Sequence, residues 1–334
     1  MSSSSPSKPQ FLIDLDRDGY VVVPSVVPPS VCASFVESAW SWLESFPTNN
    51  FSRTDRSTWK ASHLPSDHSK GLYNRYSVNH EAFVWNIRTQ PGILETFSQI
   101  WGTDDLIASF DGLNISLPVH PEHGRTDVEE TKPWEHIDQD PRTISECKLY
   151  QGIANLADNG PSDGGLVVLA GSHKLHQRHF DAVNGGKFRP ECDLGEGENG
   201  YNFNPEDAAW YREVAGCPEV KVCAKAGDLI LWDSRTIHWN TNPKGERTRF
   251  ATYVCYCPRS FMTEEELEKK REIFEQRKGT THWPNMNIVP ADKVDYYDAK
   301  PRRPDGSLDP ADRTRPFHEP EVTPEVLRLV GVRG

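Results

Sequence analysis

The sequence lacks any run of about 18 apolar residues, the length that a membrane-spanning helix requires. Its polar start, MSSSSPSKPQ, lacks the apolar core of a signal peptide, and its last residues, VRG, differ from the peroxisomal tripeptide. We therefore expect a cytoplasmic protein that does not contact the membrane.

An excess of basic residues is also missing, since the net charge is −12. This charge argues against nucleic acid or an anionic membrane surface as the main partner. The seven cysteines form no CxxC pair and are odd in number, which disfavours zinc fingers and a disulfide framework. With 36% hydrophobic residues the chain can form a core, so a folded protein with a small-molecule partner is expected. Homo-oligomerisation is left open.

The first hundred residues indicate a short tail followed by mixed structure. Residues 1–10 are rich in Ser and Pro and are expected to be disordered. The β-branched run between Gly19 and Pro24 predicts a strand. Apolar spacing predicts a helix from an N-cap at Ser30 to about Phe46, and a second helix over about 92–101.

From about Leu106 the sequence changes to short β-like runs separated by turn residues. The runs are LIASF, LNISLPV, CKLYQGIANL, GGLVVLAGS, VKVCAKAGDLILWD and RFATYVCYC. They predict a mainly β protein with flanking helices and a double-stranded β-helix core, that is, a cupin-like jelly roll. We expect this domain, with its N-terminal helices, to span residues 11–258. Residues 259–334 are expected to be a helical and irregular extension packed on the same domain, with one capped helix over 263–277 and an otherwise unstructured remainder.

The stretch WEHIDQDP places His136 two residues before Asp138. Side chains two apart on a strand point to the same face, so the pair can bind one metal ion. Two other His-x-acid pairs occur, His120/Glu122 and His179/Asp181, and chance alone produces such pairs in a chain with 12 His and 49 acidic residues. The spacing by itself does not choose among them.

A distant stretch, GDLILWDSRTIHWNTNP, supplies a third candidate ligand, His238, at the end of an apolar strand. A second imidazole would complete the two-His-one-carboxylate set of non-haem Fe(II) enzymes, which leaves coordination positions open on one side. The next strand carries Arg247 and Arg249. An arginine there could bind the far carboxylate of a keto-acid through paired hydrogen bonds.

The order of these motifs resembles that of the phytanoyl-CoA dioxygenase-like family of Fe(II)/2-oxoglutarate-dependent dioxygenases. The motifs are DRDGYVVVPSVVP, His136-x-Asp138, GGLVVLAGSHK, GDLILWDSRTIH and the arginine strand. The resemblance covers about residues 11–258. It implies that His136, Asp138 and His238 are the catalytic iron ligands, with 2-oxoglutarate as co-substrate, O2 as oxidant and ascorbate as the reductant in vitro.

The resemblance also assigns residues around the iron. Arg249, two residues before the small Ala251, is preferred over Arg247 as the 2-oxoglutarate anchor. Asn240 stands where relatives often carry a hydroxyl residue that bonds the co-substrate. Gln151 stands where some relatives have an indole, so an ordinary strand role is the alternative.

Several residues flank the proposed ligands and could line a substrate cavity. For each of them, packing or a surface polar contact is an equally good interpretation. They are Trp134, Asn114 and Arg235, together with His120 and Trp239.

The implied reaction oxidises an unactivated C–H bond by hydroxylation, desaturation or ring formation, with release of succinate and CO2. We expect a small metabolite as substrate, amino-acid-like or a secondary-metabolism intermediate. The alternatives are an acyl-CoA hydroxylase and a metal-bearing jelly roll that binds or regulates without catalysis. A zinc or manganese isomerase of the cupin type fits the mixed His and carboxylate ligands less well.

Overall fold

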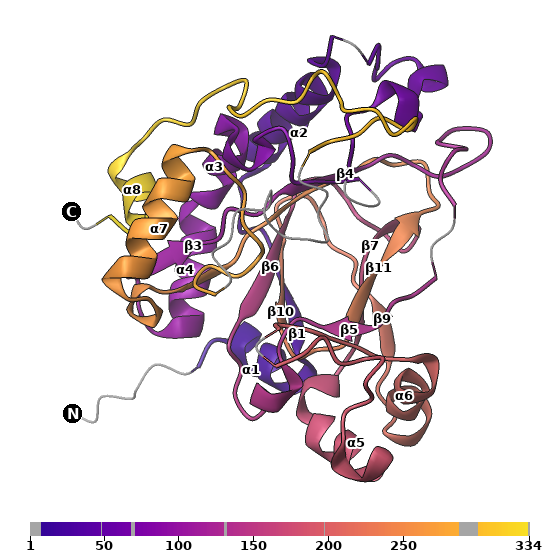
Figure 1. The fold of residues 1–334 in the computed structure, drawn as a ribbon, viewed down its shortest axis with the longest axis vertical. Coiled ribbons are helices and arrows are strands. Elements are labelled where there is room, and N and C mark those ends of the chain that lie inside the picture. Colours follow the sequence, from indigo (N-terminus) through magenta and orange to yellow (C-terminus); the bar gives the residue numbers. More distant parts are fainter. Residues whose placement is uncertain are drawn as a thin grey trace.

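Two antiparallel sheets face each other in the computed structural model, which describes residues 8–47, 49–67, 71–129, 132–196, 198–286 and 300–332 (Figure 1). The six-stranded sheet has the order β1 (Tyr20–Val23), β10 (Leu229–Asp233), β6 (Tyr150–Asn155), β12 (Arg249–Tyr253), β4 (Leu113–Ser116) and β2 (Leu72–Tyr73). The five-stranded sheet has the order β8 (Tyr201–Asn202), β5 (His136–Ile137), β11 (His238–Pro243), β7 (Asp163–Leu169) and β9 (Glu219–Lys221). A separate pair joins β13 (Tyr256–Pro258) to β3 (Leu106–Ala108). The predicted jelly-roll core is confirmed.

Helices flank the sheets on two sides (Figure 1). The group beside the six-stranded sheet comprises α2 (Pro29–Glu44), α3 (Ala82–Arg88), α4 (Pro91–Trp101), α7 (Glu264–Glu275) and α8 (Pro324–Val330). Near the lower end of the barrel lie α1 (Gln10–Asp18), α5 (His176–Ala182) and α6 (Pro205–Ala209). Short helical turns are η1 (Arg56–Thr58), η2 (Ala61–His63), η3 (Val78–His80), η4 (Pro141–Thr143), η5 (Ser172–Lys174), η6 (Asn184–Gly186), the π-helix η7 (Trp210–Val214) and η8 (Arg259–Phe261). None of the described helices is both long and apolar enough to cross a bilayer.

Two expectations were wrong, one about the start of a helix and one about the C-terminal remainder. Helix α2 begins at Pro29 with Pro28 as its N-cap, so Ser30 lies inside the first turn. Proline is well suited to the first helical position, because the N–H that it lacks has no partner there anyway. The C-terminal remainder is not wholly irregular, since Thr323 caps α8 by accepting a hydrogen bond from the N–H of Val326. By contrast, the capping box of Thr263 and Glu266 at the start of α7 is confirmed.

Buried apolar side chains of the described residues form several clusters, and two of them pack on either face of the six-stranded sheet. A large cluster packs the helices against the outer face of the six-stranded sheet, and it includes Leu329 and Val330 of α8. A smaller cluster, with Ile153, Val168 and Trp232, fills part of the space between the two sheets. The candidate site lies next to this second cluster.

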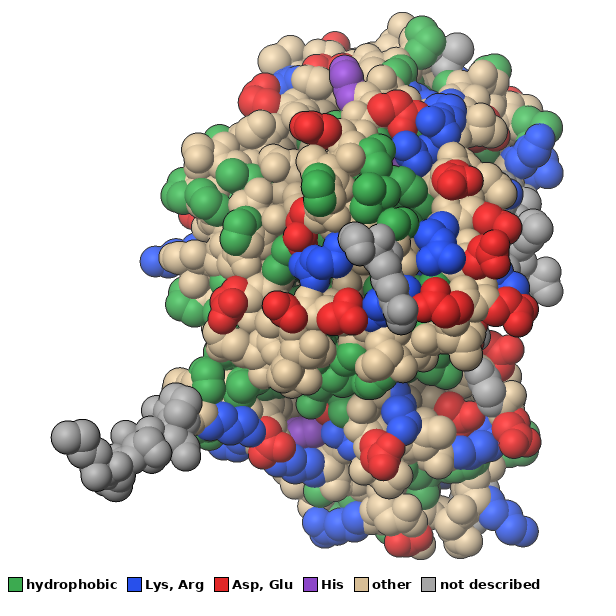
Figure 2. All heavy atoms as spheres, turned by 90° about the vertical axis from the view of Figure 1, so that its left-hand side faces the viewer, with side chains coloured by type: hydrophobic (Ala, Val, Ile, Leu, Met, Phe, Trp, Pro, Cys, Tyr) green, Lys and Arg blue, Asp and Glu red, His purple; other side chains and the backbone are tan. Residues whose placement is uncertain are grey.

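The face shown in Figure 2 carries acidic and basic side chains close to one another, with small apolar patches between them. Interspersed charges give no large field of one sign on this face. The net negative charge of the chain is therefore not concentrated here.

Lys270 of α7 is a buried cation. Its ammonium donates a hydrogen bond to the carbonyl of Pro284 (3.1 Å) and lies 4.3 Å from the ring centroid of Phe110. Burial lowers the pKa of Lys270 to about 7. The charged form is therefore disfavoured in the folded protein.

This burial predicts a pH dependence of stability. In the unfolded chain a lysine has a pKa of about 10.4. Between about pH 7 and 10 the unfolded state then binds more protons, and stability should rise with pH. We expect Lys270→Met to remove this rise, so that the variant gains more stability relative to wild type at pH 7 than at pH 9.5. Urea unfolding at both pH values measures the difference. The neighbouring exposed residue offers the control Lys269→Met, and an equal pH response in the two variants would contradict the prediction.

Candidate metal centre

The pairing of β5 with β11 brings two histidines together. His136 is the direct antiparallel partner of His238, and the two ring centroids lie 4.3 Å apart. Asp138 follows β5, and its backbone N–H donates to the carbonyl of Ser234 (2.9 Å), on the turn that leads to β11. The His136–Asp138 pair and His238, about 100 residues later in the sequence, thus come together.

Hydrogen bonds orient both imidazoles. Nδ1 of His136 lies 2.9 Å from the carbonyl oxygen of Trp134, and Nδ1 of His238 lies 2.9 Å from that of Thr236. In each ring Nδ1 is therefore the donor, which leaves Nε2 unprotonated and available to a metal. The two Nε2 atoms lie 3.8 Å and 3.1 Å from the carboxylate of Asp138. One ligand atom from each residue lies within 4.8 Å of the others, so the two nitrogens and one oxygen fit a ferrous ion.

The electrostatics of this group favour metal ligation. Burial, together with the charge of His238, lowers the pKa of His136 to about 4. Burial raises the pKa of Asp138, but the nearby imidazoles of His282, His238 and His136 outweigh it and hold that pKa well below its usual range. At neutral pH the ligands therefore include a neutral His136 and an ionised Asp138, the forms that bind metal.

Gln151 touches the metal ligands directly. Its side-chain amide donates to Oδ2 of Asp138 at 2.7 Å. The residue lies on β6, opposite Trp232 of β10. Its observed contact is with the carboxylate ligand, and a role in the co-substrate pocket stays a prediction.

The two arginines are placed differently. Arg249 begins β12 and is buried, whereas Arg247 precedes the strand and forms an ion pair with Asp163. The expectation that the strand carries both arginines was wrong, because the strand begins only at Arg249. Gly165 makes room for the buried arginine: a Cβ there would lie 2.8 Å from its Nε, and the backbone has φ +94°. Tyr253 lies four residues after Arg249 on β12 and therefore on the same strand face.

Three other predicted residues lie on or beside the strands of the barrel. Asn240 lies two residues after His238 on β11, and Asn114 of β4 is buried and accepts a hydrogen bond from the hydroxyl of Ser116 at 2.7 Å. Trp134 stacks on His136 at 5.4 Å and is 41% exposed, so it flanks the metal group from the outside. The roles of all three stay predictions.

The side chain of Arg235 is engaged within the fold, and its place in a substrate cavity stays a prediction. Its guanidinium forms paired hydrogen bonds with Asp233 (2.9 and 2.7 Å) and donates to the carbonyl of Ile144 (3.0 Å). These contacts explain the residue as part of the turn between β10 and β11.

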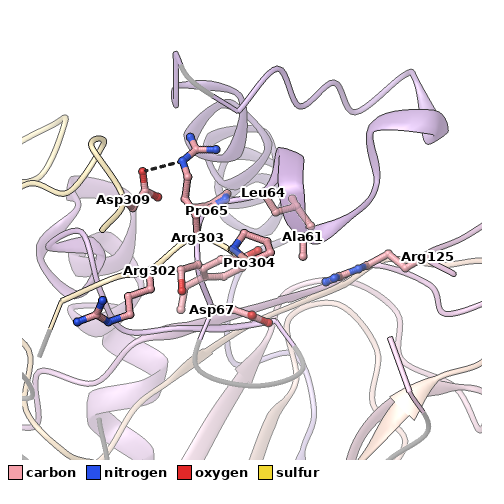
Figure 3. A pocket seen from close by; sticks show the side chains of 11 residues that line it. Ala61, Leu64, Pro65, Asp67, Arg125, Arg302, Arg303, Pro304 and Asp309 are labelled. Carbon is pink, nitrogen blue, oxygen red and sulfur yellow. Dashed lines mark ion pairs between the residues drawn. The ribbon is translucent and has the colours of Figure 1, made fainter. Parts of the chain in front are cut away.

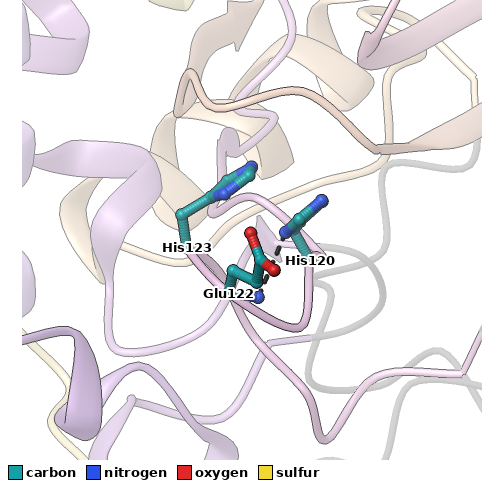
Figure 4. A group of neighbouring side chains, drawn as sticks. All are labelled: His120, Glu122 and His123. Carbon is teal, nitrogen blue, oxygen red and sulfur yellow. Dashed lines mark hydrogen bonds between the residues drawn. The ribbon is translucent and has the colours of Figure 1, made fainter.

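The other His-x-acid pairs have different surroundings. His179 is fully buried on α5, with Phe180 and Tyr211 around it. His120 and Glu122 lie with His123 on a loop after β4, and these three could also hold an ion (Figure 4). There the rings of the two histidines stack at 3.5 Å, and Nδ1 of His120 already accepts a hydrogen bond from the N–H of Glu122. Glu122 is exposed, so this group is the weaker metal site.

A separate polar cavity of about 220 Å³ lies between the N-terminal segment and the C-terminal tail (Figure 3). Three arginines line it, Arg125, Arg302 and Arg303, together with Asp67 and Asp309. None of the residues that line it belongs to the His136 group. The cavity is therefore distinct from the candidate metal centre.

The sequence reasoning missed three residues near the centre. Tyr253 could have been found from its spacing of four from Arg249, which gives the same strand face. Trp232, whose ring lies 5.4 Å from that of His238, carries no motif of its own. His282 has Nε2 4.0 Å from Oδ1 of Asp138 and comes from the C-terminal extension, where no local pattern marks it.

The chain is similar to a known protein family, to a relative from Aspergillus versicolor and to several solved structures. The family described as "Phytanoyl-CoA dioxygenase (PhyH)" matches residues 15–251. The "Ava biosynthesis cluster protein O" of Aspergillus versicolor is 36% identical over 276 residues, covering 83% of this chain and 86% of that protein. Among solved structures, the epimerase SnoN in complex with Fe3+, alpha ketoglutarate and nogalamycin RO is 18% identical with a TM-score of 0.48, covering 74% of this chain and 82% of that one. The carbocyclase SnoK from nogalamycin biosynthesis is 16% identical with a TM-score of 0.47, covering 75% and 84%.

The Fe(II) affinities of two variants test whether the metal binds at the His136 group or at the His120 group. We expect His238→Ala to weaken Fe(II) binding by about 100-fold or more, because the loss of a direct ligand should exceed the 10- to 100-fold cost of losing an outer partner. His120→Ala should bind Fe(II) as the wild type does. Anaerobic equilibrium dialysis measures both affinities. The assignment is wrong if His120→Ala loses the metal while His238→Ala keeps it.

Proposed function

Because the chain belongs to the phytanoyl-CoA dioxygenase family, whose enzymes use Fe(II), 2-oxoglutarate and O2, we propose that it oxidises an unactivated C–H bond of a small metabolite. The protein is a 2-oxoglutarate-dependent non-haem iron dioxygenase. The observation that carries the proposal is the convergence of His136, Asp138 and His238 in the same barrel as the buried Arg249. All four residues lie within the matched range 15–251.

Different residues of the chain have different roles in the proposed reaction. His136, Asp138 and His238 would hold the iron, which, when bound, couples decarboxylation of 2-oxoglutarate to succinate and CO2 with oxidation of a C–H bond. Gln151 holds one oxygen of the Asp138 carboxylate. The apolar cluster with Trp232 and Val168 excludes water from the neighbouring barrel interior.

The spacing between the ligands and Arg249 suits 2-oxoglutarate. His238 pairs with Val168 on β7, and the guanidinium of Arg249 lies beside Gly165 of the same strand. Three residues along a strand span about 10 Å. A five-carbon diacid that is bound at the metal through one end can therefore direct its far carboxylate toward the arginine fork. Asn240, on β11 between these two levels, lies where a polar contact with the co-substrate would fall.

A small secondary-metabolism intermediate is the substrate class that we favour. The relative from Aspergillus versicolor is named for a biosynthesis cluster, which supports this class. A carboxylate at Asp138 favours hydroxylation, desaturation or ring formation, because related halogenases have a small residue there. The structure does not favour the acyl-CoA alternative. The arginines of the cavity in Figure 3 are engaged within the fold, Arg125 with Asp127 and Arg303 with Asn49.

A matched pair of arginine variants tests the co-substrate site. Lysine keeps the charge but loses the planar fork, so we expect Arg249→Lys to raise the KM for 2-oxoglutarate by about tenfold or more, while Fe(II) still binds. Arg247→Lys should leave the KM near the wild-type value, since that side chain is 54% exposed and pairs with Asp163. Succinate release with Fe(II), ascorbate and 2-oxoglutarate measures both. Wild-type protein that binds iron but releases no succinate would instead support the binding module.

A further inference from the structure

The segment after α7 returns to the barrel and places His282 at the metal centre. Its Nε2 lies 4.0 Å from Oδ1 of Asp138. This nitrogen is buried and has no hydrogen-bond partner among the described residues. His282 lies beyond residue 251, where the family match ends, so the family pattern does not assign it.

The backbone around His282 is fixed on both sides. Before it, the N–H of Thr280 donates to the carbonyl of Phe110, and the hydroxyl of Thr280 accepts from the N–H of Phe110, each at 2.9 Å. After it, the indole of Trp283 is buried in a cluster with Leu149 and Cys255. The ammonium of Lys270 holds the next carbonyl, that of Pro284. The imidazole is therefore placed by docked neighbours on each side of it.

The carboxylate of Asp138 is approached by polar groups on both of its oxygens. Oδ2 accepts the amide of Gln151 at 2.7 Å and lies 3.1 Å from Nε2 of His238. Oδ1 faces His136 at 3.8 Å and His282 at 4.0 Å. A separation of 4.0 Å exceeds a hydrogen bond by about 1 Å, which a small rotation of the imidazole closes. Carboxylates that bind metals are themselves held by hydrogen bonds, and losing such a partner weakens the site.

We propose that His282 is a positioning residue of the metal centre, donating its Nε2–H to the Asp138 carboxylate from the side opposite Gln151. The C-terminal extension then completes a centre whose ligands all come from the barrel. We place His282 beside the ligand set of His136, Asp138 and His238, whose ligand atoms lie within 4.8 Å of one another. The inference rests on the proposed iron site.

Two substitutions at one position test this role. His282→Ala removes the donor, and His282→Gln retains an N–H at a similar reach. We expect His282→Ala to weaken Fe(II) binding by about 10- to 100-fold, as for other outer partners of metal ligands, and His282→Gln to recover most of that loss. The KM for 2-oxoglutarate at saturating Fe(II) should change little in both variants, because Arg249 is untouched. Anaerobic Fe(II) titration and succinate release measure these values, and circular dichroism confirms that each variant folds.

His318→Ala is the control, since this histidine of the same extension has a side chain that is 83% exposed. It should bind Fe(II) as the wild type does. The inference is overturned if folded His282→Ala keeps wild-type affinity, or if His282→Gln is as weak as His282→Ala. Loss of stoichiometric metal binding in His282→Ala, matching His238→Ala, would make His282 a ligand and also overturn it. A wild-type protein that neither binds Fe(II) nor releases succinate would instead overturn the proposed function.

Discussion

The pairing of β5 with β11 is the constraint on which the site depends. It sets His136 directly opposite His238 and delivers Asp138 at the adjoining turn. Because strand side chains alternate between faces, a shift of β5 by one residue would turn His136 to the face opposite His238. The short length of β5, two residues, means that neighbouring contacts must hold the register. The hydrogen bond from Asp138 to the carbonyl of Ser234 is one of them.

The surroundings of this strand pair in the barrel set the protonation states of the ligands. Burial keeps His136 neutral, and the surrounding imidazoles keep Asp138 ionised, so folding itself prepares these two ligands. Gly165 has no side chain, and this leaves room for Arg249, because a Cβ there would collide with the guanidinium. A cation is thereby kept inside the barrel on β12, in the sheet that faces the one carrying His136 and His238. The proposal of a keto-acid-dependent oxygenase, as opposed to a barrel that only binds metal, rests on these two features together.

Sequence reasoning could predict the parts of this structure that local patterns encode. The short strands, the cap at Thr263 and the motif order around His136 and His238 could all be predicted from the sequence. The start of β12 could not, because whether Arg247 faces inward depends on its ion pair with Asp163, a contact over 84 residues. The helix α8 and the approach of His282 were missed for the same reason. Both depend on docking of the C-terminal extension against the barrel and its helices, and no local spacing reports such packing.

An anaerobic crystal structure with Fe(II) and 2-oxoglutarate, with iron located by anomalous scattering, tests the central claim most directly. The account predicts a single strong iron peak between His136, Asp138 and His238, with the far carboxylate of 2-oxoglutarate on Arg249. An iron peak at His120, Glu122 and His123 instead, or a co-substrate bound away from Arg249, would contradict it.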